Sequence, residues 1–235
     1  MDQEFVARYS GTPEQAAEIS RSFLLKVYNW MAMGLAITGL VAFAVSRFVS
    51  VYVMQKYIFV FYGLLVFELI LVWGLTWAID KIPPFLGLLA FLFYAFLNGL
   101  TLSVIFYVYT SATLFMTFFV TAGTFIGMSV FGYITKIDLT KFGAFLYMGL
   151  FGLIIGTFAN IFWANSTFYW LVTYAGVIIF VGLTAYDTQR IKKQAMETDG
   201  SDDAGKRASI MGALALYLDF INLFLFLLRI FGRRS

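Results

Sequence analysis

Residues 57–79 read YIFVFYGLLVFELILVWGLTWAI, and Glu68 is the single charged residue among them. An α-helix needs about 20 consecutive apolar residues to cross a bilayer, so this stretch is long enough to span. Six further apolar stretches of similar length follow or precede it. They cover approximately 25–46, 85–107, 112–134, 142–163, 168–188 and 209–229. The sequence therefore predicts an all-α membrane protein with seven transmembrane helices.

The composition of the whole chain supports this fold class. Of 235 residues, 61% are hydrophobic and 12% are charged, whereas about 25% of residues are charged in a typical soluble domain. So little charge excludes a soluble enzyme, a disordered chain and a nucleic-acid-binding module. An outer-membrane barrel is disfavoured because its strands alternate apolar and polar residues, and the apolar stretches here are continuous.

The domain organisation follows from where polar residues gather. Residues 1–24 are polar, and we expect them to form a cytoplasmic N-terminal segment that is not cleaved. Thr12 and Pro13 resemble the cap and first position of a helix. Residues 25–235 then form a single membrane domain, in which the polar stretch 189–208 is expected to be a loop between the sixth and seventh helices.

Two Gly-x-x-x-Gly pairs predict close helix packing within this domain. They are Gly123 with Gly127 and Gly152 with Gly156. Small residues at this spacing allow the backbones of neighbouring helices to approach each other.

Lysine and arginine residues indicate the orientation in the membrane, because they concentrate on the cytoplasmic side. The side of the membrane opposite the N-terminus would hold Arg47, Lys56, Arg229, Arg233 and Arg234. The N-terminal side would hold more of these residues: Arg8, Arg21, Lys26, Lys81, Lys136, Lys141, Arg190, Lys192, Lys193, Lys206 and Arg207. This imbalance predicts a cytoplasmic N-terminus. Seven spans place the C-terminus outside, but the three C-terminal arginines argue against that placement. A last helix that enters the membrane and returns would put both ends inside.

Cysteine and histidine are both missing from the chain, which limits the kinds of functional site that it can form. The chain has no Cys and no His, so thiolate and imidazole metal sites are excluded, as is the side chain that usually titrates near neutral pH. A pH response would depend on carboxyl groups instead. The last apolar stretch has no Lys, which excludes a retinal Schiff base.

Three carboxylates lie within the apolar stretches: Glu68, Asp187 and Asp219. An aspartate at the membrane centre costs about 2.5–3.5 kcal/mol on insertion scales, so such residues usually face the bundle interior and serve a function. Asn222 shares the helix face of Asp219 and is a candidate supporting residue. Two aspartates that meet in a dry setting share a proton. They would also offer the oxygen ligands that calcium prefers.

The depths of the two aspartates complicate their meeting. At the standard helical rise, Asp187 would lie about 5 Å inside the membrane and Asp219 about 15 Å inside. They can meet only if the last helix starts below the membrane surface or the sixth helix extends past it.

Two motifs around these aspartates identify a family. Residues 184–189 read TAYDTQ and residues 216–224 read LYLDFINLF, and both resemble the Bax inhibitor motif family of transmembrane proteins, bacterial branch. The resemblance covers all seven apolar stretches. It implies a bacterial inner-membrane protein whose last helix is central in a ring of six, and a pH-sensitive calcium leak gated by Asp187 and Asp219.

The resemblance also implies a second pair and exposes one departure. A glutamate of the second helix and an arginine late in the last helix form a further pair in the family, and here they would be Glu68 and Arg229. In a calcium-leaking bacterial member, an arginine at the end of the second helix contacts the aspartate pair. Ile79 occupies that position here, and the nearby Lys81 would substitute for it as a point charge.

Three functional hypotheses remain at this point. The leading one is a pH-sensitive leak pathway for calcium or another cation, without turnover chemistry and without a resident cofactor. The alternative is a membrane-embedded regulator that binds a membrane protease or another partner, because other bacterial members are linked to protease regulation. An intramembrane aspartyl protease is disfavoured, because the Gly-x-Gly-Asp element of that class is absent before Asp219. Asn98, Thr101 and Asn160 would line the route or bond between helices.

Overall fold

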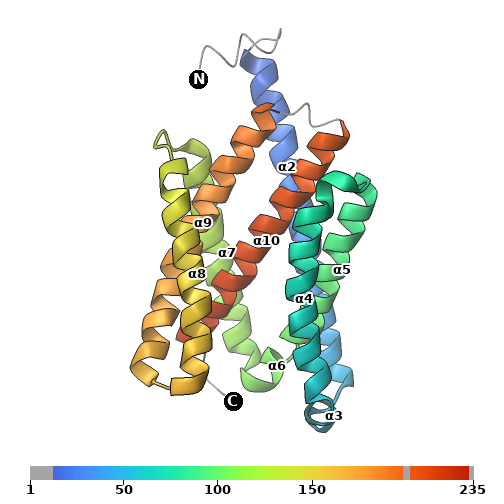
Figure 1. Cartoon of the computed structure of the whole chain (residues 1–235), viewed down its shortest axis with the longest axis vertical. Helices are drawn as coiled ribbons and strands as arrows, with labels where there is room; N and C mark the ends of the chain where they lie inside the picture. The colour runs from blue at the N-terminus through green and yellow to red at the C-terminus, as the bar shows by residue number, and fades with distance from the viewer. Residues whose placement is uncertain (1–12, 198–201, 233–235) are drawn as a thin grey trace. The chain divides into compact units, whose positions relative to one another are not determined.

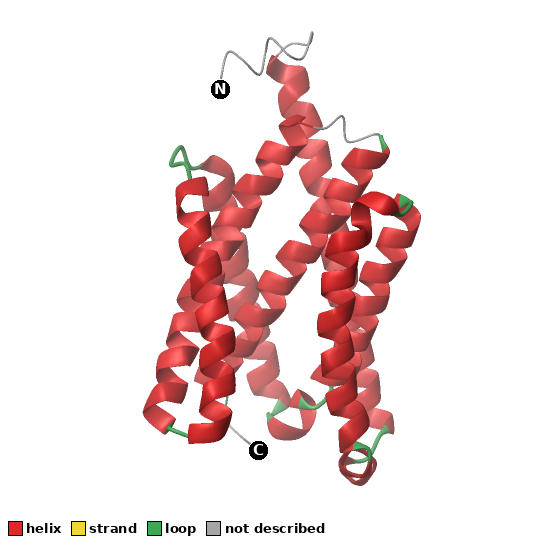
Figure 2. Ribbon diagram, viewed as in Figure 1, coloured by secondary structure: helices red, strands yellow, loops and turns green. Residues whose placement is uncertain are grey.

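A computed structural model describes residues 13–197 and 202–232, and all regular structure in this part of the chain is helical (Figures 1 and 2). The helices, with η1 a short 3-10 turn, are α2 (Pro13–Phe48), α3 (Val51–Lys56), α4 (Ile58–Ala78), η1 (Ile79–Lys81), α5 (Pro84–Leu102), α6 (Ile105–Val108), α7 (Ser111–Ile134), α8 (Thr140–Trp163), α9 (Ser166–Glu197) and α10 (Asp203–Phe231).

Seven helical segments of the described chain are long and apolar enough to cross a membrane. They are Glu18–Phe48, Ile58–Lys81, Pro84–Val108, Ser111–Ile134, Thr140–Asn160, Ser166–Met196 and Asp203–Phe231. This confirms the predicted fold class. The helix α2 begins at Pro13 as predicted, whereas its predicted cap Thr12 lies outside the described residues.

The polar stretch 189–208 was expected to be a loop, and this expectation is wrong for most of its length. The helix α9 continues to Glu197, and α10 begins at Asp203. The extension consists mainly of residues with high helix propensity. It also has an inner face, since Ile191 and Ala195 stand four residues apart and are buried.

The last helix is a single unbroken helix. Asp202 caps its start, because the Asp202 Oδ1 atom accepts a hydrogen bond of 2.7 Å from the backbone N–H of Gly205. From Asp203 to Phe231 it has 29 residues, about 44 Å at the standard rise. A helix that enters the membrane and returns is therefore contradicted for this segment.

The chain groups into two compact units. The first runs to Val108 and resumes from Ile191 to Tyr217, and the second comprises 109–190 and the chain from Leu218 onward. Both α9 and α10 contribute one part to each unit. The single membrane domain and the central position of the last helix in a ring of six stay predictions.

In the first unit, α2 packs closely on α5. The Thr38 hydroxyl donates a hydrogen bond of 2.8 Å to the carbonyl oxygen of Ala95. A Cβ atom at Gly99 would lie 2.8 Å from the Thr38 carbonyl oxygen, so this crossing requires glycine. The start of α10 is tied to the turn before α5, because Arg207 Nε donates to the Ile82 carbonyl oxygen at 2.9 Å.

In the second unit, α9 and α10 share an apolar core in which the rings of Phe180 and Phe226 stack with centroids 5.8 Å apart. The helix α7 meets α9 at Gly132, where a Cβ atom would collide with the carbonyl oxygen of Ala185.

The predicted Gly-x-x-x-Gly packing is wrong for Gly123, Gly127 and Gly152. Apart from the chain neighbours and the backbone of the same helix, no described atom lies within 4 Å of a Cβ atom placed at any of them. Gly156 does pack, against Val172. Glycine spacing alone does not identify the packed face, which depends on the neighbouring helix.

Candidate functional site

Asp187 of α9 and Asp219 of α10 meet inside the second unit. Each is 4% exposed, and their carboxyl groups lie within hydrogen-bond reach of each other. The depth difficulty disappears because α9 extends beyond Asp187 as far as Glu197, about 15 Å at the standard rise. The sixth helix thus runs past the point where the apolar stretch ends.

A hydrogen bond between the two carboxyl groups would need a proton, because two ionised carboxylates only accept hydrogen bonds. Asp187 Oδ1 and Asp219 Oδ2 are buried and find no hydrogen-bond donor among the described residues. Like charges this close in a dry environment do not both ionise. Two buried carboxyl groups placed this way would share one proton.

Arg190 and Tyr147 complete the surroundings of the pair. Arg190 Nη1 lies 3.5 Å from Asp187 Oδ1 and donates a hydrogen bond of 3.2 Å to the hydroxyl of Tyr147 in α8. The ring of Tyr186 meets the ring of Tyr147 edge to face, with centroids 5.9 Å apart. If the pair shares one proton, Arg190 would balance its single negative charge.

Two contacts fix the helix segment that carries Asp187. The side-chain amide of Gln189 donates to the Ile137 carbonyl oxygen and accepts from the Leu139 N–H, each at 2.8 Å. Gln189 thus holds the turn between α7 and α8 against α9. On the preceding turn of α9, the contact between Gly132 and Ala185 holds α7 close.

The pair by itself is too small a ligand set to retain calcium. Calcium takes 6–8 oxygen ligands, and the described residues contain no group of three or more Asp, Glu, His or Cys side chains placed for a metal.

Glu68 lies in the first unit, in a different kind of environment. Its carboxylate accepts hydrogen bonds from Asn98 Nδ2 at 3.1 Å and from the Thr101 hydroxyl at 2.9 Å. The hydroxyl of Tyr217 lies 3.2 Å from Asn98 Oδ1 and 2.7 Å from the Thr38 hydroxyl. Asn98 and Thr101 therefore bond between helices, while Asn160 accepts locally from the Asn165 N–H at 3.1 Å.

Each of the other predicted residues lies in an environment of its own. Arg229 lies 4.8 Å from the ring centroid of Phe226, in the second unit, and its pairing with Glu68 stays a prediction. Lys81 Nζ lies 3.4 Å from the ring centroid of Trp77. A supporting role of Asn222 also stays a prediction, since its amide donates to the carbonyl oxygen of Leu218 in its own helix at 2.8 Å. Ile79, at the position of the family's arginine, is buried.

Seven candidate spans and a buried carboxylate pair define a multi-pass membrane protein. Residues 20–235 match the family model described as inhibitor of apoptosis-promoting Bax1. Inner membrane protein YbhL of Escherichia coli is 46% identical over 217 residues, covering 91% of this chain and 92% of that protein. A protein of Borreliella burgdorferi is 41% identical over 225 residues, covering 94% and 96%. The chain belongs to the Bax inhibitor family.

Arg190 was predicted only to indicate orientation, and no role was predicted for Tyr147 or Gln189. A signal for Arg190 was present, since it follows Asp187 by three residues, and residues at this spacing are neighbours on a helix. Ending the sixth helix at residue 188 concealed it. Tyr147 and Gln189 act through contacts between helices and turns, which no local spacing reveals.

Proposed function

We propose that the protein is a pH-sensitive leak pathway for calcium or another cation in the bacterial inner membrane, gated by Asp187 and Asp219. The observation that carries the proposal is that two buried carboxyl groups lie within hydrogen-bond reach of each other and next to Arg190. The inner-membrane location is supported by the name of the Escherichia coli relative. The count of lysines and arginines supports a cytoplasmic N-terminus.

The proposed gate follows from charge balance. With one proton, the pair carries one negative charge, and Arg190 balances it. A second proton at lower pH neutralises the pair, and Arg190 then has no counter-charge. Because the Arg190 side chain is 47% exposed, it can move into solvent when released. We assign the closed state to the singly protonated pair and the open state to the doubly protonated one.

The test is calcium flux into dye-loaded liposomes that contain the purified full chain, at pH 6 and pH 8. Wild-type flux should be higher at pH 6. Asp219→Asn should keep flux low at both values, because the amide replaces the shared proton and leaves Asp187 charged beside Arg190. Asp187→Asn should raise flux at both, because the charge that holds Arg190 is gone. A change of about 1 kcal/mol in this equilibrium alters the open population about fivefold.

Asp203→Asn is the control, since this exposed aspartate of α10 lies outside the pair. Both asparagine variants changing flux in the same direction would contradict the gate while leaving the pathway intact. Folded wild-type protein with no flux above empty liposomes would contradict the pathway itself. That result would turn attention to the partner-binding alternative.

A further inference from the structure

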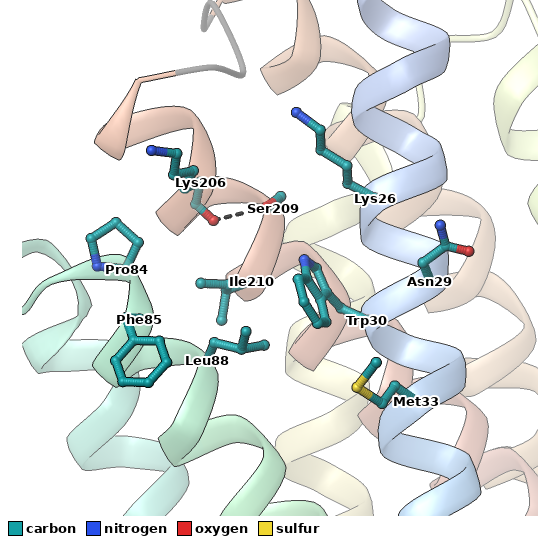
Figure 3. A pocket seen from close by; sticks show the side chains of 10 residues that line it. All are labelled: Lys26, Asn29, Trp30, Met33, Pro84, Phe85, Leu88, Lys206, Ser209 and Ile210. Atoms are coloured by element: carbon teal, nitrogen blue, oxygen red, sulfur yellow. Dashed lines mark hydrogen bonds between the residues drawn. The ribbon is translucent and has the colours of Figure 1, made fainter.

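A cavity of about 580 Å³ opens in the first unit, where α2, α5 and the start of α10 come together (Figure 3). Ten residues line it: Lys26, Asn29, Trp30, Met33, Pro84, Phe85, Leu88, Lys206, Ser209 and Ile210. None of them belongs to either carboxylate site. The volume is within the range of about 300–1,000 Å³ typical of small-molecule sites.

Each of the three helices presents one stripe of side chains to the cavity. On α2 the lining residues begin at Lys26 and end at Met33, which stands seven residues later on the same helix face. On α10 they begin at Lys206 and end at Ile210, four residues later. Both stripes start with a lysine, continue with a polar residue (Asn29 on α2 and Ser209 on α10) and end with apolar side chains, so the cavity is chemically divided along its length.

Figure 3 shows this division directly. The ammonium groups of Lys26 and Lys206 lie at one end, and the side chains of Met33, Leu88 and Phe85 lie at the other. Trp30 stands between the two ends, as tryptophan commonly does at the boundary between headgroups and acyl chains. The lining set contains two cations and no carboxylate. Asp203, which pairs with Lys206 at 3.4 Å, is exposed, and such surface pairs contribute little.

We infer that this cavity binds an anionic phospholipid, with the phosphate between Lys26 and Lys206 and an acyl chain along Trp30, Leu88 and Ile210. Charge complementarity selects an anionic headgroup, and the apolar end selects a lipid over a free phosphate. Basic pockets between transmembrane helices bind anionic lipid headgroups elsewhere. The site is independent of the proposed cation pathway, because no residue of the aspartate pair takes part.

The test is native mass spectrometry of the detergent-purified full chain titrated with dioleoyl phosphatidylglycerol, with dioleoyl phosphatidylethanolamine as the zwitterionic comparison. The wild type should bind phosphatidylglycerol selectively. The double variant Lys26→Gln/Lys206→Gln should lose about tenfold or more in affinity for it. Lys136→Gln/Lys141→Gln removes the same charge outside the cavity and should bind like the wild type.

A second variant tests the apolar end without altering charge. Leu88→Trp fills the cavity and should abolish selective binding, whereas Leu89→Trp, at a neighbouring position exposed outside the cavity, should not. Thermal unfolding verifies that each variant folds. Equal binding of the two lipids, competition by glycerol 3-phosphate, or phosphatidylglycerol binding that survives both cavity variants would each overturn the inference.

Discussion

The two buried carboxylate sites of this protein differ in how their oxygen atoms are satisfied. In the first unit, both oxygens of Glu68 accept hydrogen bonds, from Asn98 and Thr101. In the second, Asp187 and Asp219 each keep an oxygen atom without a donor among the described residues. A satisfied buried carboxylate stabilises a single structure, whereas a pair that depends on one proton changes when the proton count changes.

The largest effect should come from removing Glu68. Glu68→Ala leaves the Asn98 amide buried without its acceptor and creates a cavity, so the free energy of unfolding should fall by about 3 kcal/mol. Thermal or denaturant unfolding of the detergent-purified protein measures this. Glu18→Ala, at an exposed position of α2, is the control. Equal stability of the two variants would mean that the Glu68 network is dispensable.

The next effect concerns the approach of α7 to the aspartate pair. Gly132→Ala places a Cβ atom against the Ala185 carbonyl oxygen, and the resulting shift should cost about 2 kcal/mol of unfolding free energy. Gly123→Ala, where the new atom meets nothing described within 4 Å, should be neutral or stabilising by up to about 1 kcal/mol. Equal destabilisation by both substitutions would show that the packed and open glycines do not differ.

Replacing a carboxyl group by an amide should change the pH dependence of protein stability differently at the two sites. On the proposed mechanism, the folded aspartate pair would hold a proton that the unfolded chain releases, so its contribution to stability would fall as pH rises. Asp219→Asn supplies a permanent donor and should raise the free energy of unfolding by about 1 kcal/mol at pH 8, and by less at pH 6.

Glu68→Gln is the matched exchange in the other unit. The Thr101 hydroxyl also reaches the Asn98 carbonyl oxygen at 3.0 Å, so it can donate there and accept from the new amide. Because both oxygens of Glu68 accept hydrogen bonds, this exchange should change the pH dependence of stability less than Asp219→Asn does. Unfolding curves at pH 6 and pH 8 that changed alike for both variants would contradict the distinction between the sites.

The smallest effect should come from Tyr147→Phe. It removes the hydroxyl that accepts from Arg190 Nη1, a partly exposed contact worth about 0.5 kcal/mol. Calcium flux at pH 8 should rise about twofold, because the closed position of Arg190 is weakened. Tyr174→Phe, at an exposed position of α9, should leave flux unchanged. A fall in flux for Tyr147→Phe would contradict the assigned role of Arg190.

Much of the fold was predictable from residues 57–79 and the six similar stretches. A bilayer-spanning helix must be long and apolar, and few other structures have long continuous apolar stretches. The prediction was wrong where the helices become less apolar. The helical extension beyond residue 188 is polar on one face, so its mean hydropathy is low and the helix was predicted to end too early. The pattern of Ile191 and Ala195 marks its inner face.

For the candidate site, the sequence determined which carboxylates stand within apolar helices, because each is costly there and stands out from its neighbours. It could not determine how each carboxylate is satisfied. Glu68 bonds to residues about 30 positions away, and Asp187 meets Asp219 across two helices. Hydrogen bonds and shared protons depend on distances of a few ångströms between helices. Only the tertiary structure decides whether these contacts form. The rotation of each helix about its axis and the length of each helix determine whether the same residues lie together or apart.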